Sequence, residues 1–276
     1  MSLTEYPPEI HLLADLGIDL DPSDPGQMVA RMPVTPHLLG TDQGVLAGVL
    51  ATLVDVVGGA IAARALHPDW MATADMSLQV VRSVVGPVVE ARGTVRRQGR
   101  TTLIVEVSVF ELPDQDSPVA WSILSFAVLP RAEDSPAAAI DPTFSARTDF
   151  GPGGFDGHVF DALSVEVGDE PGTVAMSVVD YVRNTIGAVQ GGVVALLADA
   201  AGSRAVAAAL GDGRTAATVD LQITYLATGR VGPMVTRVGP VSVDAVSGSG
   251  QVVVELVDAG ADDRLTAVIA VGALAS

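Results

Sequence analysis

The sequence contains no cysteine and no lysine, since all 15 basic residues among its 276 positions are arginines. Without cysteine there is no thiol nucleophile, no disulfide and no zinc site with cysteine ligands. Without lysine there is no Schiff-base chemistry and no lysine-bearing phosphate loop. A G-x-S-x-G nucleophile elbow is also missing, which argues against a serine hydrolase. Catalytic chemistry must therefore come from carboxylates, hydroxyls, amides and the four histidines.

Positive charge and aromatic residues are both scarce. The 33 acidic residues against 15 arginines give a net charge of −18, so we expect no nucleic-acid partner. A local arginine patch for a phosphate group remains compatible with this balance. Hydrophobic residues make up 49% of the chain and aromatic residues only 4%, so a core of Ala, Val and Leu is expected rather than disorder.

One apolar stretch, residues 45–63, is long enough to cross a bilayer and contains a single ionisable residue, Asp55. Its glycines, its central carboxylate and the lack of basic flanks favour a buried helix instead of a membrane span. The first ten residues, MSLTEYPPEI, lack the basic and apolar regions of a signal peptide. We therefore expect a cytoplasmic protein with no membrane span.

The chain is a tandem repeat. GVLATLVDVVGGAIAARAL at residues 48–66 aligns without a gap to GVVALLADAAGSRAVAAAL at residues 192–210, with nine of nineteen residues identical. The match continues on both sides, where VARMPV aligns with VAMSVV, TADMSLQV with TVDLQITY, and Gly86-Pro87 with Gly232-Pro233. The offset between the copies varies only from 144 to 146. Two copies of one domain follow from this periodicity. The predicted boundaries are 1–131 for the first repeat, 132–157 for a linker rich in Pro, Ala, Gly and Asp, and 158–276 for the second repeat.

Each copy has the same pattern of elements. Helices are predicted at 45–66 and 191–210, and β-branched runs bounded by turn residues predict strands. The expected strands are 26–35, 72–85, 87–97, 101–111 and 119–129 in the first copy, and 172–180, 216–227, 234–246, 251–258 and 265–272 in the second. A helix that is apolar nearly all round must be covered on most sides, and an adjacent sheet can wrap it. The predicted class is α+β, with two hotdog domains in tandem, each a five-to-six-stranded antiparallel sheet around a long central helix.

The segment NTIGAVQGGVVALLADAAG, residues 184–202, resembles the helix-entry motif of PaaI-like acyl-CoA thioesterases. In that family an Asn, then His-Gly-Gly six residues later, and then a helix Asp recur. The resemblance covers both repeats and implies a pseudo-dimeric double hotdog that hydrolyses acyl thioesters. It is closer in the second repeat. The first has Gly40, Leu46 and Ala47 at the Asn, His and Gly positions, and the second has Gln190 at the His position.

Asp55 and Asp199 occupy the same position of the two repeats, each in mid-helix among small apolar neighbours. A lone carboxylate there loses hydration when buried, and a structural role is the alternative to a catalytic one. The resemblance implies that this acid acts on the thioester, as a general base or as a nucleophile. It also implies that the backbone N–H of Gly191, at the positive end of the helix, polarises the thioester oxygen.

In family homodimers each active site takes its loop from one subunit and its acid from the other. The resemblance therefore implies two unequal composite sites in this chain. We expect the competent one to combine Asn184, Gln190 and Gly191 with Asp55 and Thr73. The other combines the degenerate loop 40–47 with Asp199 and Thr218.

Arginine is the only cation available for the phosphates of coenzyme A. The candidates are Arg82, Arg96, Arg97, Arg100 and Arg230. The histidines lack metal-ligand spacing, so no metal is expected, and coenzyme A enters only as part of the substrate. His11 and His158 lie in related segments, HLLADL and HVFDAL, that read as amphipathic entries to the two repeats.

The sequence thus predicts an acyl-CoA thioesterase that assembles as a homo-oligomer, a dimer of double hotdogs. The rival hypothesis is a non-catalytic hotdog module that binds an acyl thioester or serves as an interaction scaffold. The missing histidine and the eroded first loop favour the rival.

Overall fold

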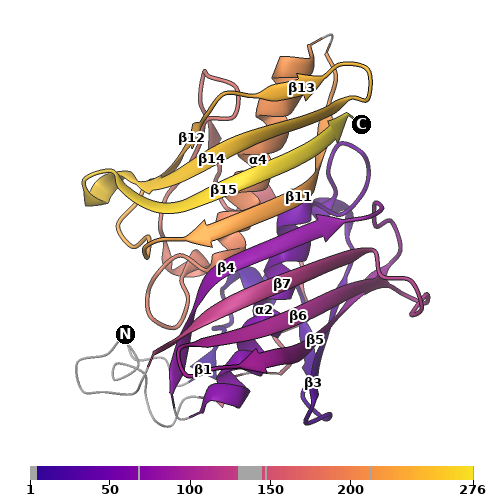
Figure 1. Ribbon diagram of the computed structural model, residues 1–276, viewed down its shortest axis with the longest axis vertical. Helices are drawn as coiled ribbons and strands as arrows, with labels where there is room; N and C mark the ends of the chain where they lie inside the picture. Colours follow the sequence, from indigo (N-terminus) through magenta and orange to yellow (C-terminus); the bar gives the residue numbers. More distant parts are fainter. Residues whose placement is uncertain (1–4, 68, 130–144, 147, 212, 276) are drawn as a thin grey trace.

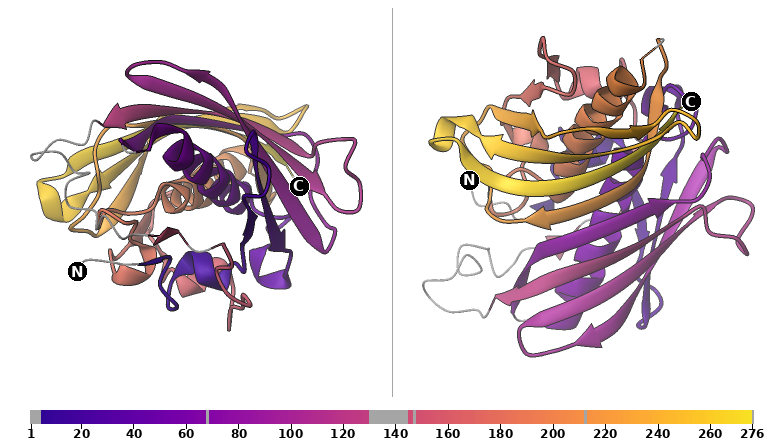
Figure 2. Two further views of the ribbon diagram at one scale, coloured as in Figure 1. Left: turned by 90° about the horizontal axis from the view of Figure 1, so that it is seen from below. Right: turned by 45° about the horizontal axis from the view of Figure 1, so that its top comes forward.

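The computed structural model describes residues 5–67, 69–129, 145–146, 148–211 and 213–275. Two long helices lie side by side and are covered by one large antiparallel sheet that curves over them (Figure 1). Short helices and loops lie on the side of the two helices away from the sheet (Figure 2). The molecule therefore has a sheet, a helical layer and a thinner outer layer of short segments.

The first repeat contributes the long helix α2 and six strands of the sheet. Its elements are β1 (Glu5–Tyr6), α1 (Leu12–Asp15), β2 (Asp19–Asp21), β3 (Gln27–Pro33), η1 (Pro36–Leu38), α2 (Ala47–Leu66), β4 (Trp70–Val80), β5 (Val88–Gln98), β6 (Thr102–Glu111) and β7 (Ala120–Leu129).

The second repeat contributes α4 and the remaining strands of the sheet. Its elements are α3 (Val159–Ala162), β9 (Glu166–Val167), β10 (Val174–Met176), η3 (Asp180–Val182), α4 (Gly191–Leu210), β11 (Ala216–Tyr225), β12 (Met234–Val238), β13 (Ser242–Asp244), β14 (Ser249–Asp258), η4 (Ala259–Ala261) and β15 (Arg264–Ala275). The short strand β8 (Ser145–Ala146) pairs with β1 outside the large sheet.

The tandem hotdog architecture predicted from the sequence is confirmed. The strands follow the order β2-β3-β5-β6-β7-β4-β11-β15-β14-β12-β10-β9, so each repeat forms one half of a continuous sheet. One predicted strand, 234–246, is divided into β12 and β13. Gly239 and Pro240 lie at the break, where proline cannot donate a ladder hydrogen bond.

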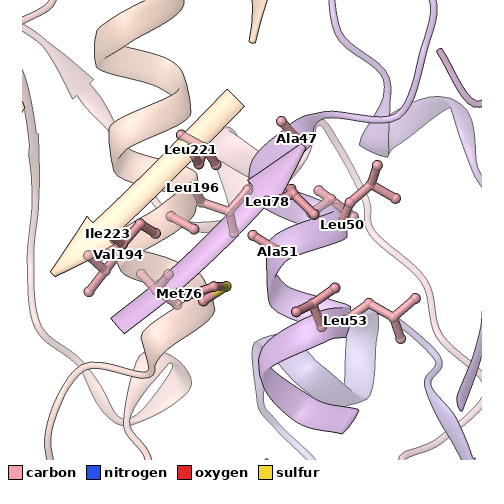
Figure 3. Close-up of a cluster of buried hydrophobic side chains, with 14 of the residues drawn as sticks. Ala47, Leu50, Ala51, Leu53, Met76, Leu78, Val194, Leu196, Leu221 and Ile223 are labelled. Carbon is pink, nitrogen blue, oxygen red and sulfur yellow. The ribbon is translucent and has the colours of Figure 1, made fainter. Parts of the chain in front are cut away.

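The two half-sheets join at the antiparallel pair β4 and β11. Ser77 lies opposite Gln222, its own counterpart in the repeat alignment, so an approximate twofold axis passes through this pair. On the inner face of the seam, buried apolar side chains of both strands pack against both helices, as Figure 3 shows for Met76, Leu78, Leu221 and Ile223. This shared core makes the two repeats one packed unit.

The helices α2 and α4 touch through glycines near their N-terminal ends. A Cβ atom on Gly48 would lie 2.6 Å from Leu196 Cα, and one on Gly192 would lie 2.5 Å from Thr52 Cα. Only glycine permits this approach. Each helix start is thereby pressed against the middle of the other helix, one turn before Asp55 or Asp199.

Both long helices are apolar and long enough to cross a membrane by length and composition alone. In the structure 61% of the tested window of α2 and 72% of that of α4 are buried inside the protein. Packing against the sheet and against each other accounts for their composition, as the sequence analysis expects for core helices.

Part of the predicted linker, residues 132–144 and 147, lies outside the described residues. The described part that follows packs onto the first repeat. Phe150 is buried and its N–H donates to the Ile18 carbonyl at 3.0 Å, while the Leu20 N–H donates to the Thr148 carbonyl at 2.6 Å. This segment therefore packs onto the first repeat, and its Phe150 lines a cavity.

Candidate active site

Two cavities lie at equivalent places of the two repeats, each at the start of one long helix and the middle of the other. The Asp55 cavity has a volume of about 430 Å3 and the Asp199 cavity about 1030 Å3. Each is lined by residues of both repeats, so neither domain alone would complete a site.

In the Asp55 cavity the carboxylate is held from both repeats. Gln190 Nε2 donates to Asp55 Oδ2 at 3.0 Å, and Thr73 Oγ1 donates to Asp55 Oδ1 at 3.3 Å. The backbone N–H of Gly192 is a third donor to the carboxylate. The structure thus brings together Asp55, Thr73, Gln190 and Gly191, four of the five residues that the sequence analysis groups in one composite site.

Gln190 is fixed because it also caps α4. Its Oε1 accepts the Val193 N–H at 3.2 Å, which leaves Nε2 to face Asp55. An N-cap side chain satisfies one of the free donors of the first helical turn. The orientation of the Gln190 amide is therefore set by a donor, the Val193 N–H, and an acceptor, the Asp55 carboxylate.

Gly191 lies against the carboxylate, and a Cβ atom there would be 2.7 Å from Asp55 Oδ2. Its carbonyl accepts the Tyr225 hydroxyl at 3.1 Å, whereas its own N–H has no acceptor among the described residues. A free N–H at the positive end of a helix, beside a carboxylate and in a cavity, can stabilise negative charge that develops on a bound carbonyl oxygen.

The surroundings shift the acidity of Asp55. Desolvation raises the pKa of Asp55 from 3.8 to about 6, against the lowering effects of the Thr73 hydroxyl and the Gly192 N–H. The side chain still keeps partial access to the cavity. At neutral pH it is therefore an ionised base with a proton affinity suited to proton transfer.

Asp199 has a different environment. Gly48 N–H donates to Asp199 Oδ2 at 2.8 Å, and the side chain is only 2% exposed. Burial raises its pKa, opposed by the Thr218 hydroxyl and the Gly48 N–H. Leu46 occupies the position of Gln190 in the other repeat, and its side chain has no hydrogen-bond donor. The two sites share a carboxylate, a threonine and a helix N-terminus, and they differ in the side chain that orients the acid.

Asn184 lines the Asp55 cavity but serves its own loop. Its Oδ1 accepts the N–H groups of Ile186 at 3.1 Å and Ala188 at 3.0 Å. Among the described residues no hydrogen bond joins Asn184 to Asp55. The side chain thus shapes the turn that leads to Gln190.

The rest of the Asp55 cavity is largely apolar. Its wall includes Gly59, Ala60 and Ala63 of α2 together with Phe126 and the linker residue Phe150. Tyr6 and Tyr225 also line it, and burial raises the pKa of both phenols. Tyr6, Tyr225 and Phe150 are not predicted from the sequence, because no motif or periodicity marks them. The carboxylate donors Gly48 and Gly192 are not predicted either, although their identity at the first position of the aligned repeats could have revealed them.

The candidate arginines lie in three separate regions of the fold. Arg82, after β4, forms an ion pair with Glu111 and lines the Asp199 cavity. Arg96, in the hairpin of β5 and β6, pairs with Glu106 at 2.5 Å, and Arg97 and Arg100 are exposed nearby. Arg230 is exposed between β11 and β12. Of the five, only Arg82 lines either of these two cavities, so the structure does not gather them into one patch beside Asp55.

Within the described ranges no group of three or more His, Cys, Asp or Glu residues could hold a metal ion. The polar groups that the Asp55 cavity presents include a carboxylate, an amide, the Thr73 hydroxyl, two phenols and a backbone N–H.

Comparison with known proteins gives matches along both repeats. A family model described as the thioesterase superfamily matches residues 44–117 and 186–257. A Halobacterium salinarum protein whose assignment as an esterase is provisional is 31% identical over 114 residues, which is 39% of this chain and 74% of that protein.

Solved structures match over nearly the whole chain. A provisionally assigned thioesterase II from Thermobifida fusca is 19% identical, covers 98% of both chains and has a TM-score of 0.61. A tesB protein from Mycobacterium avium subs paratuberculosis is 15% identical, covers 96% of this chain and 98% of its own, and also has a TM-score of 0.61. At such identities the likeness concerns the fold, and it extends to the tandem arrangement.

Proposed function

Because the chain belongs to the thioesterase superfamily, we propose that it is an acyl-CoA thioesterase whose working site is the Asp55 cavity. The reaction adds water to an acyl thioester and yields a free acid and a thiol. The observation that carries the proposal is the hydrogen bond from Gln190 to Asp55, which joins the catalytic loop of one repeat to the acid of the other.

The proposed roles follow from the contacts of each group. Asp55, ionised at neutral pH, acts either as a general base toward water or as a nucleophile toward the thioester carbon. The free N–H of Gly191 would donate a hydrogen bond to the carbonyl oxygen as negative charge develops on that oxygen. Gln190 and Thr73 fix the two carboxylate oxygens. The apolar wall that includes Phe126 would receive the acyl group.

The Asp199 cavity is proposed to be the weaker or inactive site. Asp199 is almost fully covered, and Leu46 cannot orient it as Gln190 orients Asp55. Since the two cavities are related by the same approximate symmetry, the difference in activity is expected to come from these substitutions.

The test is thiol release from acyl-CoA esters of increasing chain length by the intact chain and by Asp55→Asn and Asp199→Asn variants. We expect Asp55→Asn to lower kcat by at least about 100-fold, the range of a lost acid–base group, and Asp199→Asn to retain most activity. Loss of turnover in Asp199→Asn with an active Asp55→Asn protein would reverse the assignment of the two sites.

The candidate arginines do not converge on the Asp55 cavity, so the contribution of the coenzyme A nucleotide to substrate binding requires its own assay. Parallel assays with acyl N-acetylcysteamine esters, which lack the nucleotide, measure how much of the recognition depends on it. If no ester of either kind is hydrolysed above background while acyl-CoA still binds, the protein is a binding module instead of an enzyme.

A further inference from the structure

A histidine near the start of the chain reaches the loop that carries Gln190. His11 caps the short helix α1, with Nδ1 accepting the Leu13 N–H at 3.1 Å and Nε2 lying 2.9 Å from the Arg183 carbonyl oxygen. Because Nδ1 is an acceptor, the ring proton is on Nε2, which donates to Arg183. His11 is 1% exposed, and burial lowers its pKa, which favours this neutral form.

The second repeat contains the equivalent contact, related by the approximate twofold axis. His158 caps α3, with Nδ1 accepting the Phe160 N–H at 3.3 Å and Nε2 lying 3.1 Å from the Leu39 carbonyl oxygen. Each histidine therefore holds a loop of the opposite repeat.

The two acceptor residues occupy the same repeat position. Arg183 forms an isolated β-bridge with Val189, and Leu39 forms one with Val45, so both close the loop that precedes a long helix. Gln190 follows Val189 directly, and its N–H donates to the carbonyl of Val182, the residue before Arg183, at 2.9 Å. The hydrogen bond to the Arg183 carbonyl is thus connected to Gln190, which orients Asp55, through the β-bridge between Arg183 and Val189.

The contact on the Asp55 side is reinforced by aromatic neighbours. The ring of Tyr6 packs edge-on against the His11 imidazole with centroids 5.2 Å apart, and the Tyr6 hydroxyl donates to the Arg183 carbonyl at 3.4 Å. The Tyr181 hydroxyl donates to Asp15 Oδ2 at 2.6 Å and ties α1 to η3 just before the loop. The first repeat therefore binds this loop and the adjoining η3 through several hydrogen bonds.

We propose that His11 is a positioning residue for the Asp55 site: its imidazole holds loop 183–190 of the other repeat, which keeps Gln190 and Gly191 beside Asp55. The inference rests on the proposed function and adds a residue that does not line the cavity. His158 makes the equivalent hydrogen bond to loop 39–46 beside Asp199, although it is partly exposed and lines that cavity, so it serves as the internal control.

The experiment compares His11→Asn with His158→Asn in the full-length protein. Asparagine retains a capping acceptor for α1 or α3 but is too short to reach the carbonyl of the other repeat. We expect similar small decreases in melting temperature for both variants. Only His11→Asn should lower kcat for an acyl-CoA ester, by about 10-fold or more, with a smaller change in KM, because misplaced catalytic groups affect the chemical step. Equal losses in both variants, no loss in His11→Asn, or a loss in His158→Asn alone would overturn the proposal.

Hydrogen–deuterium exchange provides a readout that does not need turnover. In His11→Asn, amide exchange should accelerate in peptides from 183–194 and stay unchanged in those from 39–50, and His158→Asn should give the reverse pattern. If the unmodified protein hydrolyses no ester, the proposed function fails, and the exchange pattern still tests whether His11 holds loop 183–190. Unchanged exchange at 183–194 in His11→Asn would overturn this positioning role even in an active enzyme.

Discussion

Gln190 Nε2 and Asp55 Oδ2 are 3.0 Å apart although 135 residues separate them in the chain. The contact exists because the helix start of one repeat is pressed against the middle of the helix of the other. In the Asp199 cavity the equivalent position is Leu46, so the acid there accepts from the Gly48 N–H but has no counterpart of the Gln190 amide. The two copies of the domain therefore differ in the side chain beside the acid, and Asp55 is partly exposed whereas Asp199 is only 2% exposed.

Gln190→Glu tests this contact while keeping the helix cap. Glutamate can still accept the Val193 N–H, but it has no N–H for Asp55 and places a second negative charge beside it. We expect kcat/KM at pH 7 to fall about 10-fold or more, because like charges raise the pKa of Asp55 and the carboxylate loses a donor. The pH profile of thioester hydrolysis checks this, with an acid limb displaced to higher pH than in the unmodified protein. A Gln190→Glu enzyme with an unchanged profile would contradict the proposed role of the amide.

The activity of the unmodified protein should itself depend on the ionisation of Asp55. Since desolvation raises the pKa of Asp55 to about 6, kcat/KM should rise with an apparent pKa near this value and level off above it. Stopped assays of free thiol between pH 4.5 and 8.5 would measure the limb. Asp199→Asn should leave the limb in place, and its disappearance in that variant would transfer the titration to the other site.

Asp55→Asn should make the protein more stable at pH 8. Burial raises the folded-state pKa of Asp55 from 3.8 to about 6, so the folded protein binds the proton more tightly than the unfolded chain. The stability that this gives is complete below pH 4 and is lost as pH rises to about 6. Relative to Asp55→Asn, the unmodified protein should therefore lose at most about 3 kcal/mol of unfolding free energy over that pH interval. The difference is smaller if asparagine does not form the hydrogen bonds that the carboxylate accepts.

Denaturant melts of both proteins at pH 4.5 and pH 8 measure the difference. The gap in unfolding free energy should widen toward the higher pH. A gap that is constant with pH, or that favours the unmodified protein at pH 8, would show that Asp55 is not held at a desolvation cost.

Much of the fold could be predicted because it repeats. A run of β-branched residues such as TTLIVEVSVF specifies a strand locally, and the helix at 191–210 is marked by its apolar composition and by Gly191 at its start. The nearly constant offset between the copies then shows that the two helix carboxylates occupy equivalent positions. Asp55 and Asp199 stand out because a lone acid in such a helix has no local explanation.

What could not be predicted depends on partners distant in the chain. Phe150 and Tyr6 come from segments without periodicity, and only the packing of these segments onto the repeat core brings them to the Asp55 cavity. The arginine cluster at Arg96 had the composition of an anion site, but Glu106 on the neighbouring strand neutralises that arginine. A charge pattern along one strand does not reveal its cross-strand partner.

The close approach of the two helices gives a final prediction, which concerns stability alone. Gly192→Ala would place a Cβ atom 2.5 Å from Thr52 Cα, a backbone atom that cannot move without shifting α2. We expect destabilisation of about 1–3 kcal/mol, the usual cost of overpacking a core. Gly59→Ala is the matched control on α2, because its Cβ would meet only Met71 Cε at 3.8 Å. Alanine is the better helix former, so this control should be neutral or gain up to about 1 kcal/mol. Chemical denaturation of both variants decides the matter. Equal stabilities would mean that the helices can separate without cost, and the placement of Gln190 beside Asp55 would then need another support.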